Sequence, residues 1–401
     1  MAFITMSHQE LDRYQIIQRL LRKEIENSQA AELLNLSIRQ VKRLKKKVKL
    51  FGPKALAHGN RGKQSNHRLS DSKRNKIINV VKNRYPDFGP TLACEKLTEL
   101  HSISHDVKTI RQIMIDEKLW KPKLKKHSEH REWRQRRECF GEMQQFDGSY
   151  HPWFEDRAPE CCLLASIDDA TGEITEAEFG QHETVFEVFS FWQGHLLTNG
   201  KPRSIYLDKF STYKMNPRFA QTNHELKTQF ERALKELHIE PITAHSPEAK
   251  GRVERLFGVL QDRLVKELRL HDISTIPEAN RFLKRKFLPW FNKKFAKPAA
   301  NSTNLHQILT IKEQQQLPAI FSKQYTRIVQ NDFTISFNNQ WYQLTKDQPV
   351  TICKQDQVIV EQRLDGTIKI RLRGKYLSCH IIPKRIPNRE RPWVLAAVAN
   401  H

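Results

Sequence analysis

The chain has 401 residues, with 68 Lys or Arg against 45 Asp or Glu, which gives a formal net charge of +23. This balance favours a polyanionic partner, and a hydrophobic content of 38% is enough for packed cores rather than a disordered basic tail. A mean hydropathy of −0.67, with no apolar run long enough to cross a bilayer, excludes a membrane protein.

Targeting and redox signals point to an internal compartment. Residues 1–10 lack the basic-then-apolar order of a signal peptide. The six cysteines include one adjacent pair, Cys161 and Cys162, and no C-x-x-C spacing, so they fit neither a disulfide framework nor a zinc site. We therefore expect reduced thiols in a cytoplasmic protein.

The charge is distributed unevenly along the chain. Residues 1–137 carry a net charge of +18, residues 138–200 carry −12, and residues 201–401 carry +17. Basic flanks around an acidic centre suggest DNA-binding segments on either side of a cation-binding site. A merely solvated acidic surface is the alternative interpretation of the centre.

Two short helical patterns meet at residues 35–37. Ser37 is suited to cap the second helix, and apolar residues repeat there at 38, 41 and 44. Its outer face would carry the side chains that a helix in the DNA major groove needs, namely Arg39, Gln40, Lys42, Arg43 and Lys45. We interpret residues 1–60 as a helix-turn-helix DNA-binding domain, the alternative being an ordinary helical hairpin with a charged face.

A second helical unit follows the polar connector 58–66. Helices are predicted over 69–85, 90–100 and 106–114, and the exposed face of the last holds Lys108, Thr109 and Arg111. We predict a second, winged-type helix-turn-helix DNA-binding domain over 67–120, because two such units in tandem read a longer site than one. A basic linker at 121–138 would track DNA phosphates, with a solvated tether as the alternative.

From residue 139 the pattern changes to strands that alternate with helices. Strands are predicted at 144–150, 161–167, 174–179, 203–208 and 241–244, and helices at 184–197, 228–237 and from 250 onward. Three early strands followed by alternating helices and strands indicate a mixed sheet with helices packed on it.

Three carboxylates of this region are positioned to share a cleft. Asp147 and Asp208 end apolar strands, and Glu254 lies on the long helix, outside its apolar stripe at 253, 256, 260 and 264. Such a set suits two Mg2+ ions, which activate a water or a DNA 3′-hydroxyl for in-line attack on phosphorus. The alternative is two strand-end caps and one surface glutamate.

Other carboxylates compete for this role. Asp168 and Asp169 precede Ala-Thr-Gly172, which is typical of a hairpin turn with Asp and Gly in their ordinary positions. Asp168 could also contact the metal-binding residues without binding the metal itself. Glu248 is the third competitor.

Three segments carry a resemblance to a known family. They are Phe146-Asp147-Gly148-Ser149, the run from Tyr206 to Ser211, and the run from His245 to Arg255, which reads HSPEAKGRVER. They resemble the RNase H-like core of bacterial insertion-sequence transposases and retroviral integrases, the DDE superfamily. The order of the helix-turn-helix units is most similar to the ISNCY group, and the resemblance extends from about residue 27 to the C-terminal part.

The resemblance implies an RNase H-like integrase catalytic core at 139–300. It assigns Asp147, Asp208 and Glu254 as the catalytic, metal-binding triad for two Mg2+ ions, or Mn2+ in their place, with Asp147 bridging both. By the same resemblance, Lys250 and Arg252 would contact DNA near the scissile phosphate, and His245 would line the cleft.

Two features depart from the family pattern. Asp208 and Glu254 are 46 positions apart, more than is usual in retroviral integrases, and Lys209-Phe210 follows Asp208 in place of Asn-Gly. We infer an insertion around residues 212–228.

Short alternating runs follow residue 320, with turns at 338–339 and 364–367 and a further expected strand at 350–353. They predict a small β-barrel over 320–385. Its last hairpin carries Lys369, Arg371, Arg373 and Lys375, which suits binding to DNA or to a second protomer.

The sequence thus predicts a multidomain α+β protein: tandem N-terminal helix-turn-helix modules, a central RNase H-like α/β domain with a mixed five-stranded sheet, and a C-terminal small β-barrel. We predict a transposase that binds the terminal inverted repeats of an insertion sequence, hydrolyses the 3′ ends and transfers them to target DNA. It would act as a dimer or larger homo-oligomer at the bacterial nucleoid. The alternatives are a DNA-binding regulator with an inert core and a structure-selective nuclease without joining activity.

Overall fold

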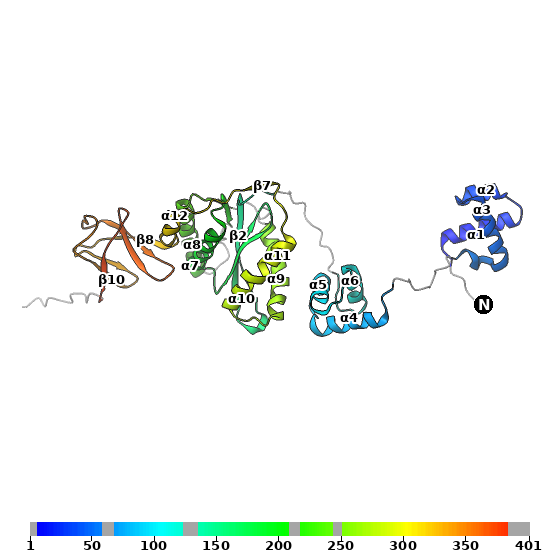
Figure 1. Ribbon diagram of the computed structural model, residues 1–401, viewed down its shortest axis with the longest axis horizontal. Coiled ribbons are helices and arrows are strands. Elements are labelled where there is room, and N and C mark those ends of the chain that lie inside the picture. The colour runs from blue at the N-terminus through cyan, green and yellow to red at the C-terminus, as the bar shows by residue number, and fades with distance from the viewer. Residues whose placement is uncertain (1–5, 58–67, 123–134, 208–216, 244–250, 384–401) are drawn as a thin grey trace, which may run out of the picture. The chain divides into compact units, whose positions relative to one another are not determined.

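The computed structural model describes residues 6–57, 68–122, 135–207, 217–243 and 251–383. The chain divides into two compact units, Met1–Lys123 and Leu124–His401, and each is described by itself. Figure 1 shows the helices of the first unit and the mixed helices and strands of the second.

The first helical module consists of α1 (His8–Leu21), α2 (Asn27–Leu34), α3 (Ile38–Phe51) and a 3-10 helix (Gly52–Leu56). Its core contains Ile17, Ala30 and Val41, all fully buried. The turn between α2 and α3 forms because Asn35 adopts a left-handed backbone with φ of +51° and Ser37 accepts a hydrogen bond from the Gln40 amide.

One residue of the predicted apolar stripe is exposed. Ile38 is 47% exposed, whereas Val41 and Val48 are buried. The buried face of α3 follows residues 41, 44 and 48, the i, i+3, i+7 repeat of a helix, and Ile38 begins the helix on a neighbouring stripe.

The second helical module consists of α4 (Asp71–Arg84), α5 (Pro90–His101) and α6 (Val107–Asp116). Pro90 occupies the first turn of α5, and the carboxylate of Asp106 accepts a hydrogen bond from the Lys108 amide at the start of α6. No strand lies among residues 68–122, so the expected wing is absent from that range.

The centre of the second unit is a five-stranded mixed sheet in the order β4-β3-β2-β5-β6. Its strands are β2 (Met143–His151), β3 (Cys161–Asp168), β4 (Ile174–Gly180), β5 (Ser204–Leu207) and β6 (Glu240–Thr243). The first three pair antiparallel, and β5 is parallel to both β2 and β6. The predicted mixed five-stranded sheet is therefore confirmed.

Helices cover both faces of this sheet (Figure 1). One face packs Phe146 and Leu164 against α7 (Val185–Asn199) and α8 (Pro217–Glu236). The other packs Leu163 and Ala165 against α9 (Gly251–Leu270), α10 (Ile276–Phe282), a π-helical turn (Leu283–Phe287) and α11 (Leu288–Phe295). Adjacent residues of a strand thus contribute to two separate cores.

Shorter elements complete the fold before the C-terminal strands. They are β1 (Cys139–Phe140), a 3-10 helix (Glu155–Arg157), β7 (Asn301–Asn304) and α12 (Ile311–Ile320), with β1 and β7 paired as a small parallel sheet. Within the described ranges, no helix combines the length and apolar composition that crossing a bilayer requires. All six cysteines are free thiols.

The C-terminal strands form two open sheets rather than the expected closed barrel. One sheet has the order β14-β10-β9 and the other β13-β12-β11-β8. The strands are β8 (Lys323–Ile328), β9 (Thr334–Phe337), β10 (Gln340–Leu344), β11 (Gln357–Gln362), β12 (Ile368–Leu372), β13 (Lys375–Tyr376) and β14 (Cys379–Ile382). The sheets share one apolar core, but the expected strand at 350–353 is irregular and does not join their edges.

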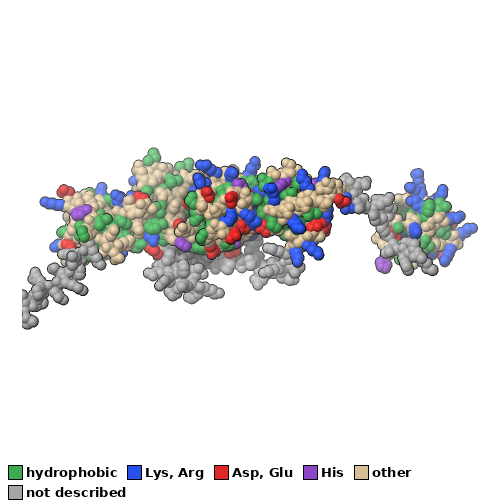
Figure 2. Space-filling model, turned by 90° about the horizontal axis from the view of Figure 1, so that it is seen from below, with side chains coloured by type: hydrophobic (Ala, Val, Ile, Leu, Met, Phe, Trp, Pro, Cys, Tyr) green, Lys and Arg blue, Asp and Glu red, His purple; other side chains and the backbone are tan. Residues whose placement is uncertain are grey.

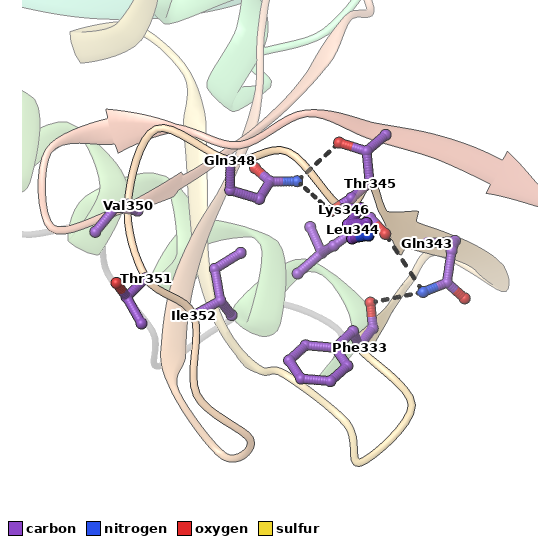
Figure 3. Close-up of a pocket in the computed structure, with 9 residues that line it drawn as sticks. All are labelled: Phe333, Gln343, Leu344, Thr345, Lys346, Gln348, Val350, Thr351 and Ile352. Carbon is purple, nitrogen blue, oxygen red and sulfur yellow. Dashed lines mark hydrogen bonds between the residues drawn. The ribbon is translucent and has the colours of Figure 1, made fainter.

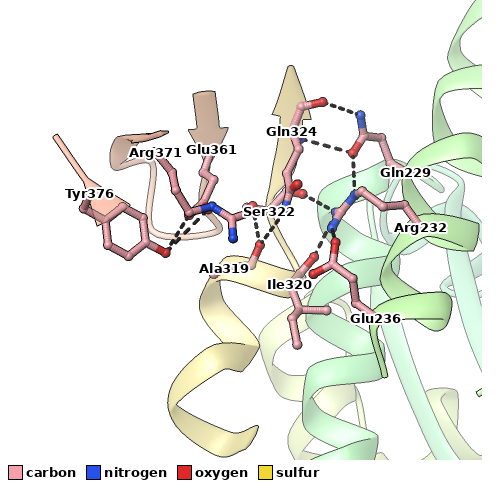
Figure 4. Close-up of polar contacts among 10 residues, drawn as sticks. All are labelled: Gln229, Arg232, Glu236, Ala319, Ile320, Ser322, Gln324, Glu361, Arg371 and Tyr376. Carbon is pink, nitrogen blue, oxygen red and sulfur yellow. Dashed lines mark hydrogen bonds and ion pairs between the residues drawn. The ribbon is translucent and has the colours of Figure 1, made fainter. Parts of the chain in front are cut away.

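The C-terminal sheets are attached to the core through α8 (Figure 4). The Gln229 side chain exchanges two hydrogen bonds with the Gln324 backbone, at 2.9 and 3.1 Å. The Arg232 guanidinium donates to the carbonyls of Ile320 and Ser322, at 2.9 and 2.7 Å. Two adjacent turns of α8 therefore hold the connection between α12 and β8.

We predict that Trp192→Ala lowers the free energy of unfolding of the core by about 3–5 kcal/mol, because a buried indole leaves a large cavity. Trp192 is fully buried in α7, with its ring 5.4 Å from Phe146 and 6.0 Å from Phe230 between centroids. Urea unfolding followed by circular dichroism measures the change. Leu197→Ala on the same helix is the control, because Leu197 is 56% exposed and should shift stability little; equal losses in both variants would contradict the prediction.

Candidate active site and DNA-binding faces

Asp147 lies in the middle of β2, on the face of the sheet that α9 covers. It pairs with Ala165 of β3, which belongs to the core beneath α9. Gln145 and Ser149 flank it on the same face, because alternate residues of a strand point to the same side. The Asp147 side chain is half-buried.

Two hydrogen bonds join α9 to β2 on either side of Asp147. The Val253 amide donates to Oε1 of Gln145 at 3.2 Å, and Nε2 of Gln261 donates to Oγ of Ser149 at 3.1 Å. Glu254 follows Val253 directly, is exposed, and shares the i, i+7 stripe with Gln261. The structure therefore brings Asp147 and Glu254 to the same side of the sheet.

Asp208, Lys250, His245 and Glu248 lie outside the described residues. The strand before Asp208 is described: β5 runs parallel to β2, with Gln145 paired to Tyr206, and ends at Leu207. In the part of the chain that the structure describes, no three His, Cys, Asp or Glu side chains are grouped to hold a metal ion.

The turn predicted after β3 is present, but its acids are not surface residues. Oδ1 of Asp168 accepts from the Thr171 amide and hydroxyl, and Gly172 has a φ of +72°. Asp168 and Asp169 are both fully buried. Burial raises the pKa of the Asp168 carboxyl, while hydrogen bonds from the Thr171 and Gly141 amides oppose that rise.

Asp169 connects three parts of the core. Its carboxylate accepts from Nε2 of Gln145 at 2.7 Å and from the Arg137 amide at 2.8 Å, and it forms an ion pair with Arg252. The sequence does not single out Gln145, and it marks Asp169 only as a competing carboxylate in a hairpin turn. The sequence feature that could have identified Asp169 is the pair of adjacent acids at the end of an otherwise apolar strand.

Arg252, expected to contact DNA, lies at the start of α9 with its side chain 15% exposed. Its guanidinium forms an ion pair with Asp169. A contact between Arg252 and DNA stays a prediction.

The expected DNA-contacting residues of α3 lie together on its surface. Arg39, Lys42 and Arg43 line a shallow hollow with Ile38 and Lys46. Gln40 closes a capping box, accepting from the Ser37 amide at 3.3 Å. Lys and Arg side chains project from this module in Figure 2.

The residues named on α6 are also exposed. Lys108 and Thr109 line a second shallow hollow with Arg68, Arg74 and Gln112, and Arg111 lies on the same helix. Asp116 also lines this hollow and forms an ion pair with Arg74, so its surface is less uniformly basic than that of α3.

Two of the four basic residues on the C-terminal hairpin are engaged within the domain. Arg371 pairs with the buried Glu361 at 3.1 Å, and Arg373 pairs with Asp356 at 3.1 Å. These ion pairs reduce the positive charge that the hairpin offers to DNA.

A third hollow, of about 530 Å³, lies in the C-terminal domain (Figure 3). Several of its polar groups bond to one another: Nε2 of Gln348 donates to the Thr345 carbonyl at 3.0 Å, and Nε2 of Gln343 donates to the Phe333 carbonyl at 3.3 Å. Phe333, Val350 and Ile352 contribute apolar lining.

One family model matches the N-terminal helical part, and two relatives match most of the chain. Residues 12–64 match the family model of a helix-turn-helix domain. The chain is 36% identical to y4bF of Sinorhizobium fredii, a protein assigned as a transposase, over 99% of this chain and 85% of that protein. It is 27% identical to the transposase for insertion sequence IS1202 of Streptococcus pneumoniae, over 91% of this chain and 85% of that protein.

Two solved structures with detectable similarity are retroviral. The catalytic core domain of HTLV-2 integrase in complex with magnesium covers 38% of this chain and 85% of its own, with 21% identity and a TM-score of 0.29. The simian T-cell lymphotropic virus intasome in complex with the PP2A regulatory subunit B56 gamma covers 77% and 97%, with 17% identity and a TM-score of 0.34.

Proposed function

This chain belongs to the insertion-sequence transposases, and we propose that it binds the terminal inverted repeats of its element, hydrolyses the 3′ ends and transfers them to target DNA. The observation that carries this proposal is the pair of hydrogen bonds, Val253 to Gln145 and Gln261 to Ser149, that holds Glu254 on the Asp147 face of the sheet. An inert regulator would have no need of two carboxylates at that place.

The proposed third acid is Asp208. It directly follows Leu207 in the sequence. Leu207 ends β5, which runs parallel to β2 beside Gln145 and the strand that carries Asp147. Strand continuity therefore supports Asp208 as the partner of Asp147.

These residues fit a divalent metal by their chemistry. Asp147 and Glu254 offer carboxylate oxygens, the ligands that Mg2+ prefers, and both side chains are accessible to a hydrated ion. We propose two Mg2+ ions, with Mn2+ able to replace them. When bound, such ions lower the pKa of the attacking water and stabilise charge on the phosphate.

The chain's own residues would orient the acids and the DNA. Asp147 pairs with Ala165 of β3 and lies two residues beyond Gln145, where the pairing of β2 with β5 ends. Glu254 depends on the packing of α9, whose Val253 and Leu260 are buried against the sheet. Lys250 and Arg252, at the same end of α9, would bind phosphates near the reacting bond.

The two helical modules would select the element ends. On α3, Arg39, Lys42 and Arg43 suit phosphates and guanine edges, and the exposed Ile38 among them suits a thymine methyl. Gln40, Lys108, Thr109 and Arg111 would add contacts. Because two ends must be cut and joined together, we propose a dimer or larger homo-oligomer on DNA in the bacterial cytoplasm.

We predict that Asp147→Asn and Glu254→Gln each slow 3′-end cleavage by about 10²–10³-fold, the order lost when one charge-stabilising group is removed. The assay is cleavage of an end-containing duplex with Mg2+, followed by linkage of the 3′-hydroxyl to a second DNA. Asp262→Asn is the matched control, because this acid lies on α9 and its side chain is 61% exposed.

Measurements of end binding, cleavage and joining distinguish the proposed transposase from a regulator and from a nuclease. All four proteins should bind the element end equally in a gel-shift assay. Wild-type binding without cleavage would favour the regulator, and cleavage without joining would favour the nuclease.

We predict that Lys42→Ala weakens binding to all DNA sequences and reduces the slope of log affinity against log salt by about 1, as expected for a phosphate contact. Arg39→Ala should cost about 1–3 kcal/mol and relax sequence preference if it reads a base. Fluorescence anisotropy at several salt concentrations measures both. Lys54→Ala, an exposed lysine outside α3, controls for net charge; equal effects of Lys54→Ala and Lys42→Ala would count against α3 as the recognition helix.

A further inference from the structure

Asp169 is a fully buried carboxylate that receives donors from three different elements. They are the Gln145 side chain on β2, the Arg137 amide just before β1, and the Arg252 guanidinium on the first turn of α9. A buried charge is costly unless it is paired and hydrogen-bonded, so this acid requires its partners to stay in place.

Gln145 extends the network to the backbone of α9. Its Nε2 donates to Asp169, which leaves Oε1 to accept the Val253 amide at 3.2 Å. That amide belongs to the first turn of α9, where a helix has no intrahelical partner for its N–H groups. Asp169 thus fixes the orientation of the Gln145 amide, and Gln145 then holds the helix.

The two routes from Asp169 reach consecutive residues of α9. One is the ion pair with Arg252, and the other passes through Gln145 to Val253. Glu254 is the next residue. A shift of this first turn would move Glu254 relative to Asp147. The first turn combines the packing of Val253 with these polar contacts, and the later part of α9 is held by apolar packing and by the Gln261–Ser149 hydrogen bond.

We propose that Asp169 is a positioning residue, which holds the first turn of α9 and so sets the place of Glu254 opposite Asp147. The consequence for catalysis rests on the proposed function. The placement of α9 does not rest on it and can be measured without an activity assay.

Asp168 provides a matched control. It is the neighbouring acid and is equally buried. Its carboxylate accepts hydrogen bonds from Gly141, Gln144 and Thr171. None of these partners lies on α9. Loss of Asp168 should therefore disturb the turn while leaving the first turn of α9 in place.

The first experiment is amide hydrogen exchange of the full chain without metal, read for the segment around residues 251–258. Asp169→Asn should accelerate exchange at the first turn of α9 by at least about tenfold, and Asp168→Asn should not. Arg252→Lys keeps a cation and should restore most of the protection that Arg252→Gln loses. Unchanged exchange in Asp169→Asn, or equal acceleration in Asp168→Asn, would overturn the proposal.

The second experiment measures end cleavage against Mg2+ concentration. Asp169→Asn should need about 10–100-fold more Mg2+ for half-maximal rate, as when a group supporting a metal ligand is lost, while end binding is unchanged. The same Mg2+ dependence as wild type would overturn the catalytic part. A wild-type chain that cleaves nothing would instead refute the proposed function and leave the exchange result to decide the placement of α9.

Discussion

The side chains of β2 point alternately to the two faces of the sheet, and the rest of the second unit depends on this alternation. This strand is covered on both faces, so each successive side chain must suit a different environment. Phe146 packs into the aromatic cluster beneath α7 and α8, with ring centroids 5.1 Å from Phe191 and 5.4 Å from Trp192. Asp147, one position later, must then face α9. A register slip of one residue would exchange the acid and the aromatic ring, so the packing of the core also fixes the side to which the acid points.

β2 carries buried polar residues on both faces of the sheet, and each has a hydrogen-bond partner. Gln144 and Gln145 are both fully buried, on opposite faces, and they bond to Asp168, the last residue of β3, and to Asp169 after it. Each amide satisfies a carboxylate and still has an oxygen left to accept another donor. Asp147 lies in the same strand but is only half-buried, which leaves it open to solvent and to a substrate.

Much of the fold could be predicted from the sequence, because its signals are local. The helix-turn-helix geometry of α2 and α3 follows from Asn35 and Ser37, and the mixed sheet follows from the order of apolar runs. The burial of Asp169 could not be predicted, because its partners are 24, 32 and 83 positions away. The exposure of Ile38 could not be predicted either, because helical periodicity alone does not say which stripe of α3 packs on α1 and α2. The strand expected at 350–353 is irregular, and the C-terminal strands form two separate sheets.

The hydrogen bonds that attach the C-terminal sheets to α8 depend on side chains at some positions and on the backbone at others. Four of these hydrogen bonds join the side chains of Gln229 and Arg232 on α8 to backbone atoms of Ile320, Ser322 and Gln324. Glu225 of α8 adds bonds to the side chains of Lys323 and Tyr325. Peptide groups are the same whichever residue carries them. A substitution at Ile320, Ser322 or Gln324 that keeps the backbone path therefore leaves these four hydrogen bonds in place, whereas truncation of Gln229 or Arg232 removes two of them.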